Sequence, residues 1–214
     1  MTERSRAAAA VEALKEIYPD GECMLKYEGE PWRLLVMAIL SAQCTDARVN
    51  LVSEELFRAY PSAGDMAAAD EEDIGEKIRS CGLWRAKAAS IKGSCQAIVR
   101  DFGGEVPQGM DELLSLPGVG RKIANLIRGD IFGLPAIVAD THCIRISSRL
   151  GFTCEGEKDP LKTEKALSAV VEPREQAAFC HRLVMFGRDV CSARSPKCGV
   201  CPLKAKSLCK RPAL

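Results

Sequence analysis

Apolar residues recur every three or four positions along most of this chain, and proline or glycine interrupts the pattern between repeats. This spacing places the apolar side chains on one face of a helix. Only residues 136–139 have an extended pattern, and one short segment cannot form a sheet, so we expect an all-α fold. Helices are predicted over residues 7–18, 32–39, 46–60, 74–81, 84–102, 110–116, 121–132, 141–150, 160–170 and 173–186.

The chain has enough apolar material for a buried core but no candidate membrane segment. Its 214 residues are 47% apolar. The longest apolar run, residues 34–40, is too short to cross a bilayer, and the N-terminal residues lack the apolar region of a signal peptide. We therefore expect a cytoplasmic protein without a membrane partner.

Two of the predicted helices meet at the sequence LPGVGRK, residues 116–122. Pro117 ends the first helix, and Gly118 and Gly120 can take positive φ, which permits a tight turn and close approach to another surface. The first N–H groups of the second helix have no intrahelical acceptor and lie at the positive end of its dipole. The segment therefore suits a phosphate, although an ordinary joint between packed helices explains the glycines about equally well.

Two residues near this hairpin pattern are candidates for chemistry. Lys122 falls in a first helical turn beside Arg121, and positive neighbours favour the neutral, nucleophilic form of an amine. A phosphate contact or a solvated surface lysine is the alternative. Asp140 precedes the predicted helix at 141–150, where its carboxylate can cap the first amides, and capping alone would account for it.

The cysteines point to a bound metal or cluster. The chain has 11, an odd number without a secretory signal, so a disulfide framework is not expected. Four of them, with the spacing C-x6-C-x2-C-x7-C, lie in a loop with too little apolar material for its own core. Such a set can bind tetrahedral zinc or a [4Fe–4S] cluster, and the spacing does not decide between them. The four are Cys191, Cys198, Cys201 and Cys209.

Charge is distributed unevenly along a chain whose net charge is only +1. Residues 181–214 contain eight Lys or Arg and one Asp, and residues 79–100 contain five Lys or Arg and no acid. These tracts suggest one cationic face, although solvated helix faces would have the same composition. Because only 5% of residues are aromatic, contact with a duplex backbone is favoured over stacking on single strands.

The hairpin, the segment VADTHCIR at residues 138–145 and the four C-terminal cysteines together closely resemble the endonuclease III family of base-excision DNA glycosylases. The resemblance extends over nearly the whole chain. It implies a helix-hairpin-helix DNA glycosylase fold with a [4Fe–4S] cluster on the loop 191–209. It also implies a six-helix barrel domain at 22–133 and a second, discontinuous domain formed by 1–21 and 134–214.

The resemblance implies a bifunctional DNA glycosylase and apurinic/apyrimidinic lyase that excises oxidised pyrimidines from duplex DNA. Lys122 would attack the anomeric carbon of the damaged nucleotide, and the resulting Schiff base would permit β-elimination. Asp140 would stabilise positive charge on the sugar. The partner would be double-stranded DNA with a damaged pyrimidine or an abasic site, bound by a monomeric enzyme associated with the nucleoid.

The resemblance also implies a set of DNA contacts. Gln43 would fill the space left by the flipped base, and Leu83 would wedge the opposite strand, although Leu83 could equally belong to the core. The other predicted contacts come from the hairpin and the cluster loop. They are Gly118, Val119, Gly120, Arg121, Arg194, Lys197, Lys204 and Lys206.

Two positions depart from the family pattern. The last cysteine spacing is seven residues instead of the usual five, and Ile123 replaces the threonine common after the lysine. Two other functions are compatible with parts of the sequence. One is a monofunctional adenine or mismatch glycosylase of the same superfamily, although these relatives usually lack the lysine; the other is a non-catalytic DNA-binding module.

Overall fold

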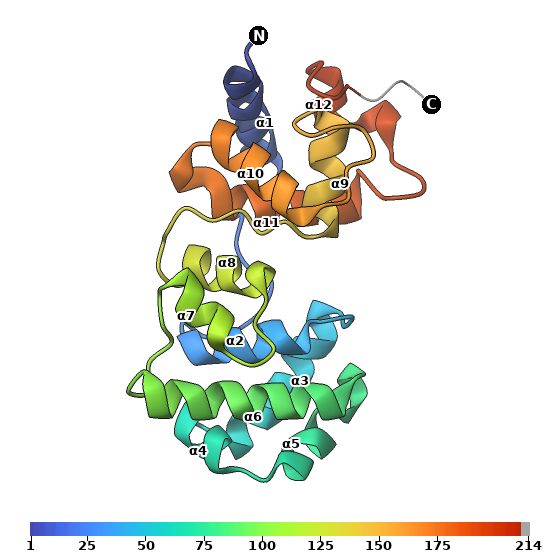
Figure 1. The fold of residues 1–214 in the computed structure, drawn as a ribbon. Helices are drawn as coiled ribbons and strands as arrows, with labels where there is room; N and C mark the ends of the chain where they lie inside the picture. Colours follow the sequence, from blue (N-terminus) through green and yellow to red (C-terminus); the bar gives the residue numbers. More distant parts are fainter. Residues whose placement is uncertain (211–214) are drawn as a thin grey trace. The chain divides into compact units, whose positions relative to one another are not determined.

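The structure, a computed structural model, describes residues 1–210 and consists there of helices and loops without a strand (Figure 1). This confirms the predicted all-α class. The last four residues of the basic tract 181–214 lie outside the described residues. The elements, with η marking a 3-10 helix, are α1 (Glu3–Ile17), α2 (Pro31–Leu40), α3 (Asp46–Ala59), α4 (Ala63–Ala68), α5 (Glu71–Lys77), η1 (Arg79–Cys81), α6 (Trp84–Asp101), α7 (Met110–Ser115), α8 (Arg121–Asp130), α9 (Thr141–Leu150), α10 (Pro160–Val170), η2 (Pro173–Glu175), α11 (Gln176–Asp189), η3 (Cys198–Val200) and α12 (Pro202–Ala205).

The chain folds into two compact units. The first consists of Met1–Cys23 together with Arg128–Leu214, and the second is Met24–Ile127. The chain therefore passes between the units twice, after Cys23 and after Ile127. The domain organisation expected from the sequence, with boundaries at 21/22 and 133/134, stays a prediction.

The second unit is built around α2 and α6. Eight of the ten residues of α2 are buried, and Pro31 occupies its first turn, where a missing N–H costs nothing. Trp32 at its start packs edge-on against Phe57 of α3, with ring centroids 5.1 Å apart. The long helix α6 contacts α2, α4 and α5 (Figure 1). Burial of these apolar faces is the main stabilising contribution in this unit.

Several elements of the fold differ from the sequence-based prediction, and the short helices η3 and α12 were not expected. Helix α4 was not expected, yet a reciprocal capping box between Ser62 and Asp65 begins it and Met66 is fully buried. The helix predicted over 74–81 begins earlier, as α5 after the cap Asp70, and ends in the separate 3-10 turn η1. The single helix predicted over 173–186 is η2 followed by α11.

In the first unit α11 contacts α1 and α9, and α10 contacts α9 and α1. Phe179 and Phe186 of α11 are completely buried. Residues 136–139 are buried and belong to no helix, and the N–H of Asp140 donates back to the carbonyl oxygen of Val138 at 2.8 Å. Among residues 1–210, none of the helices combines the length and apolar character that crossing a bilayer requires.

Candidate functional site

Helix α6 holds the hairpin between α7 and α8 in place. The Ser94 hydroxyl donates to the carbonyl oxygen of Pro117 at 2.6 Å. Gly118 has φ +77°, and a Cβ at this position would lie 2.6 Å from the Cβ of Ser90. Gly118 is therefore required both by the left-handed turn and by close packing against α6.

Val119 and Gly120, which follow Gly118 in the hairpin, differ from it in conformation and packing. The φ angle of Gly120 is not positive, so of the two glycines only Gly118 uses the left-handed conformation. A Cβ at Gly120 would meet no atom of the chain within 4 Å, so internal packing does not require this glycine. Val119 is 6% exposed, and its N–H donates to the carbonyl oxygen of Leu116 at 3.1 Å. The backbone of Val119 thus closes the hairpin.

Helix α8 begins directly behind the turn. The carbonyl oxygen of Gly120 accepts the N–H of Ala124 at 3.0 Å, which is the first i to i+4 bond of the helix. Arg121 and Lys122 lie in the first turn with exposed side chains, whereas Ala124 and Ile127 are buried. Burial of the apolar face orients the helix, so that the cationic first turn stays accessible.

Gln43 and Leu83 are exposed residues of the same unit that have left-handed backbones although they are not glycines, as does exposed Glu28. Gln43 has φ +54° and Leu83 has φ +48°, and the Leu83 residue is 60% exposed. An exposed leucine in this conformation is uncommon and cannot be explained by core packing. The alternative interpretation of Leu83 as a core residue is therefore wrong.

The buried amine of Lys87 links the loops that carry these two residues. Lys87 is 4% exposed, and its Nζ donates to the carbonyl oxygens of Leu40 and Cys81, each at 2.8 Å. Cys44, next to Gln43, also interacts with Cys81. Burial, followed by the effect of Cys44, raises the pKa of the Cys81 thiol to about 11. This thiol is therefore protonated near neutral pH, and the two loops are held side by side.

Three of the five basic residues of the tract 79–100 have polar partners within the chain. Lys87 is buried, Arg79 forms an ion pair with Glu76 at 3.3 Å, and Arg100 forms one with Asp101 at 2.5 Å. These three residues therefore offer less positive charge to a ligand than the sequence pattern suggested.

Asp140, in the first unit, is the N-cap of α9. Its Oδ1 accepts the N–H of Cys143 at 2.7 Å, so the predicted cap is confirmed for Cys143. The buried segment 136–139 precedes it and the buried face of α9 follows, which fixes the position of the carboxylate. Asp140 itself remains partly exposed.

Two arginines of α9 hold the start of the cysteine loop. Arg149 Nη1 donates to the carbonyl oxygen of Ser192 at 2.8 Å and to the Sγ of Cys191 at 3.1 Å. Arg145 Nη2 donates to the carbonyl oxygen of Cys191 at 3.1 Å. Burial, followed by the like charge of Arg149, lowers the pKa of Arg145. The loop is thus anchored by cationic hydrogen bonds in place of an apolar core.

The arrangement of the four cysteines fits a cluster better than a single ion. A tetrahedral zinc ion would bring its thiolate sulfurs to about 3.8 Å from one another. In the described part of the chain, these cysteines do not form a group whose donor atoms all lie within 4.8 Å. A [4Fe–4S] cluster spreads its ligands because each sulfur binds a different iron.

The longer last spacing is absorbed by a compact turn. After α12, Ser207 has φ +55°, and the N–H of Leu208 donates to the carbonyl oxygen of Leu203 at 2.9 Å. Both leucines are buried. The Sγ of Cys209 comes within 3.5 Å of the carbonyl oxygen of Arg149, near the anchored start of the loop.

The basic residues of the cysteine loop are not equivalent. Arg194 and Lys197 are exposed, and Lys204 is partly exposed. Lys206 forms an ion pair with Glu16 at 2.7 Å. Arg194 and Lys197 are therefore the more accessible positive charges of this loop.

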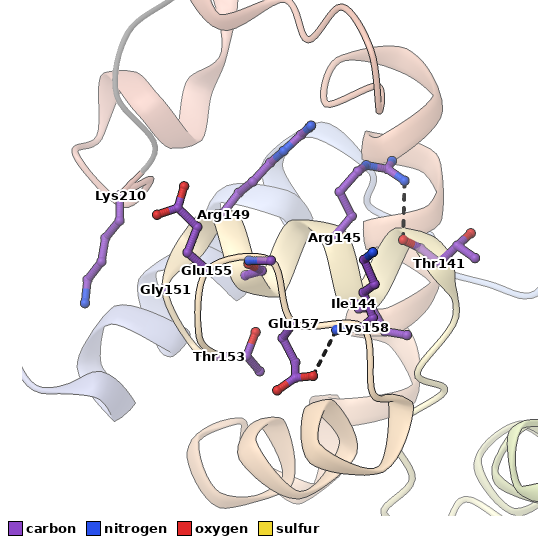
Figure 2. A pocket seen from close by; sticks show the side chains of 12 residues that line it. Thr141, Ile144, Arg145, Arg149, Gly151, Thr153, Glu155, Glu157, Lys158 and Lys210 are labelled. Carbon is purple, nitrogen blue, oxygen red and sulfur yellow. Dashed lines mark hydrogen bonds between the residues drawn. The ribbon is translucent and has the colours of Figure 1, made fainter.

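A cavity of about 730 Å³ lies between α9 and the loop that follows it (Figure 2). Arg145, Arg149, Glu155 and Glu157 contribute to its lining. The hydrogen bonds drawn there, from Arg145 to the carbonyl oxygen of Thr141 and from the N–H of Lys158 to Glu157, are internal to the loop and helix. Neither Lys122 nor Asp140 lines it, so this cavity is separate from the predicted chemistry.

Comparison with known proteins identifies the family. Residues 36–173 match the HhH-GPD superfamily base excision DNA repair protein family, and residues 191–205 match the iron-sulfur binding domain of endonuclease III. Endonuclease III of Synechocystis sp. is 45% identical over 203 residues, which cover 94% of this chain and 91% of the relative. The chain belongs to the endonuclease III family. The assignment made from the sequence is confirmed, and with it a DNA glycosylase and abasic-site lyase that carries an iron–sulfur cluster.

Two further relatives agree with this endonuclease III assignment. Endonuclease III of Bacillus subtilis is 44% identical over 200 residues, covering 94% of this chain and 90% of the relative. A solved structure of a trapped endonuclease III–DNA covalent intermediate aligns with a TM-score of 0.89 at 41% identity. That alignment covers 98% of this chain and 97% of the other, so the helix-hairpin-helix glycosylase fold is confirmed.

Sequence reasoning missed Lys87, although its substitution should have a measurable effect. Lys87→Met keeps the length of the side chain but leaves two buried carbonyl oxygens without a donor, so we expect the free energy of unfolding to fall by about 2 kcal/mol. Lys92→Met, on the same helix but partly exposed, is the matched control. Equal denaturant midpoints for the two variants would show that the hydrogen bonds of Lys87 to Leu40 and Cys81, here called the Lys87 brace, do not stabilise the fold.

Proposed function

We propose that this enzyme removes oxidised pyrimidines from double-stranded DNA and then cleaves the strand at the abasic site. The supporting observation is Lys122 in the first turn of α8, behind a hairpin of the endonuclease III type, in a chain 41% identical to an enzyme trapped covalently on DNA. A monofunctional adenine or mismatch glycosylase would have no use for this amine.

In the proposed reaction, the Nζ of Lys122 gives up a proton and attacks the anomeric carbon, and the bond to the damaged base breaks. The base leaves with the electron pair of that bond and takes a proton. Opening of the sugar ring gives a Schiff base, which acidifies the neighbouring C2′ proton. Loss of that proton forms a C–C double bond and expels the 3′ phosphate, so the strand breaks by β-elimination.

Asp140 is proposed to stabilise the positive charge that develops on the sugar as the base leaves. The hydrogen bond of Oδ1 to the Cys143 N–H supports this role, since a carboxylate held by a backbone donor is oriented before the substrate arrives. Capping and catalysis are compatible because Oδ1 caps the helix and the second carboxylate oxygen is left to face the sugar.

Gln43 and Leu83 are proposed to stabilise the flipped-out base from within the duplex. Their left-handed backbones and exposed positions support this, because neither feature serves the core of the chain. Gln43 would fill the space left by the base, and Leu83 would insert into the opposite strand. The Lys87 brace would keep the two residues at a fixed separation.

Phosphate contacts are proposed for the backbone of the hairpin and for the basic loop. Gly118, Val119, Gly120 and Arg121 form the turn and the positive end of α8. Since the N–H of Val119 already closes the hairpin, Val119 would contribute through its position and not as a donor. Arg194, Lys197 and Lys204 would add charge from the cysteine loop, and we propose a monomer that acts in the nucleoid.

The four ligands of the cluster are proposed to be Cys191, Cys198, Cys201 and Cys209. The cluster, when bound, supplies the cross-link that this loop cannot obtain from apolar packing. Arg149 would then orient the first ligand through its bond to the Cys191 sulfur.

Substitution of the two glycines of the hairpin should affect different properties, stability at Gly118 and DNA affinity at Gly120. In Gly118→Ala the new methyl group would clash with Ser90, and alanine disfavours the left-handed φ of this position. We therefore expect the free energy of unfolding to fall by about 2 kcal/mol. Gly120→Ala should change stability by less than about 0.5 kcal/mol but weaken duplex binding, because only the ligand approaches there. Denaturant unfolding and duplex titrations measure the two effects, and a Gly120→Ala protein with unchanged duplex affinity would exclude close approach at Gly120.

The covalent role of Lys122 is tested by borohydride reduction on abasic duplex DNA. Lys122→Gln should give no trapped adduct and no lyase product while duplex binding is largely retained, since the backbone of the hairpin is unchanged. Lys165→Gln, an exposed lysine of α10, is the control and should trap like the unmodified enzyme. If Lys122→Gln is trapped at the same yield as the control, another amine is the nucleophile.

Asp140→Asn should separate base excision from strand cleavage. The asparagine oxygen can still cap α9, but the negative charge is lost, so we expect base excision to slow by roughly 100-fold. The lyase reaction on a preformed abasic site should be much less affected, because the base has already left. Single-turnover assays on the two substrates measure the difference, and equal losses on both would contradict the proposed role.

A further inference from the structure

A second group of potential metal ligands lies apart from the four cysteines of the loop. The Sγ of Cys23, a carboxylate oxygen of Asp130 and a ring nitrogen of His181 all lie within 4.8 Å of one another. The side chains of His181 and Asp130 are only 12% and 9% exposed. All three residues belong to the first unit of the chain.

The N-terminal segment is held over α11 by Arg182, the residue after His181. Arg182 Nε donates to the carbonyl oxygen of Tyr18 at 2.9 Å, and its Nη2 donates to that of Pro19 at 3.0 Å. Gly21 then turns with φ +48° so closely that a Cβ there would lie 2.6 Å from the guanidinium carbon of Arg182. This anchored turn brings Cys23 to His181.

The end of α8 is held against the same helix. A Cβ at Gly129 would lie 2.9 Å from the Cβ of Ala177, so the two backbones approach closely. One helical turn further along α11, the Nε2 of His181 lies 2.8 Å and 3.1 Å from the two carboxylate oxygens of Asp130. Both contacts are set by packing, and the ligand atoms are therefore positioned before any ion binds.

The distances within the group suit one small ion. Bonds of about 2.0 Å to nitrogen and oxygen place two ligands of a tetrahedral zinc ion about 3.3 Å apart, and a thiolate about 3.5 Å from either. The contact between His181 and Asp130 is already close to that value, and a small movement of Cys23 completes it. A sulfur, nitrogen and oxygen set is typical of zinc, which is borderline soft.

We propose that Cys23, Asp130 and His181 form a zinc site, with water in the fourth position. Binding releases the thiol proton to solvent, and the imidazole binds through Nε2 in the tautomer that carries its proton on Nδ1. Thiolate and carboxylate together neutralise Zn²⁺, so no net charge is buried. The ion joins the segment after α1, the end of α8 and α11, and so fixes both places where the chain leaves or re-enters this unit.

The test uses the enzyme with its iron–sulfur cluster intact, titrated with Zn²⁺ against a chromophoric chelator. The unmodified enzyme should bind one Zn²⁺ per chain and gain a higher melting temperature from it. X-ray absorption at the zinc edge, which the iron does not obscure, should show one sulfur at about 2.3 Å and nitrogen or oxygen at about 2.0 Å.

Matched variants decide whether these residues hold the ion. Cys23→Ser and Asp130→Asn should each weaken zinc affinity by roughly 100-fold or more, while Cys154→Ser, which removes an exposed cysteine of the same unit, should leave it unchanged. The proposal is overturned if the unmodified enzyme binds no zinc, or if Cys23→Ser and Cys154→Ser bind it equally. A zinc edge with four sulfur ligands would also overturn it, because the ion would then lie in the cysteine loop.

Discussion

A buried ammonium group must be surrounded by acceptors, and Lys87 obtains them from two loops at once. Together with the interaction between Cys44 and Cys81, these bonds join the turn after α2 to the turn before α6. One turn further along α6, Ser90 fits against Gly118, and Ser94 binds the carbonyl oxygen of Pro117. A single helix therefore fixes every segment of its unit that we propose to touch DNA. The accuracy of these contacts depends on the rigidity of α6.

Local patterns were sufficient for most of the fold. The long amphipathic helices and the cap at Asp140 follow from residue order, because each depends on neighbours in sequence. Helix α4 has only six residues, and its apolar face consists mainly of alanines, so its periodicity is weak. The capping box at Ser62 and Asp65 was the available signal, and it could have identified the helix.

Features set by distant packing could not be predicted in this way. The sequence does not reveal that Lys87 points inward, because its neighbours resemble those of the exposed basic residues around it. Gly118 and Gly120 look alike in sequence, and only the folded chain distinguishes them, by the left-handed φ of Gly118 and its contact with Ser90. Cys23, Asp130 and His181 are far apart along the chain and share no spacing rule, so their proximity emerges only from the packing around α11.

The bonds of Lys87 go to backbone oxygens, and these are present whatever side chains the loops carry. The Lys87 brace therefore does not depend on which side chains the supported loops carry. Replacement of Gln43 or Leu83 alters the side chains that would enter the duplex without removing an acceptor of the ammonium group, because the acceptors belong to Leu40 and Cys81. The geometry of the loops and the side chains that they present are in this way set by different residues. A repair enzyme built on this plan can diversify the lesions it accepts while its scaffold stays constant.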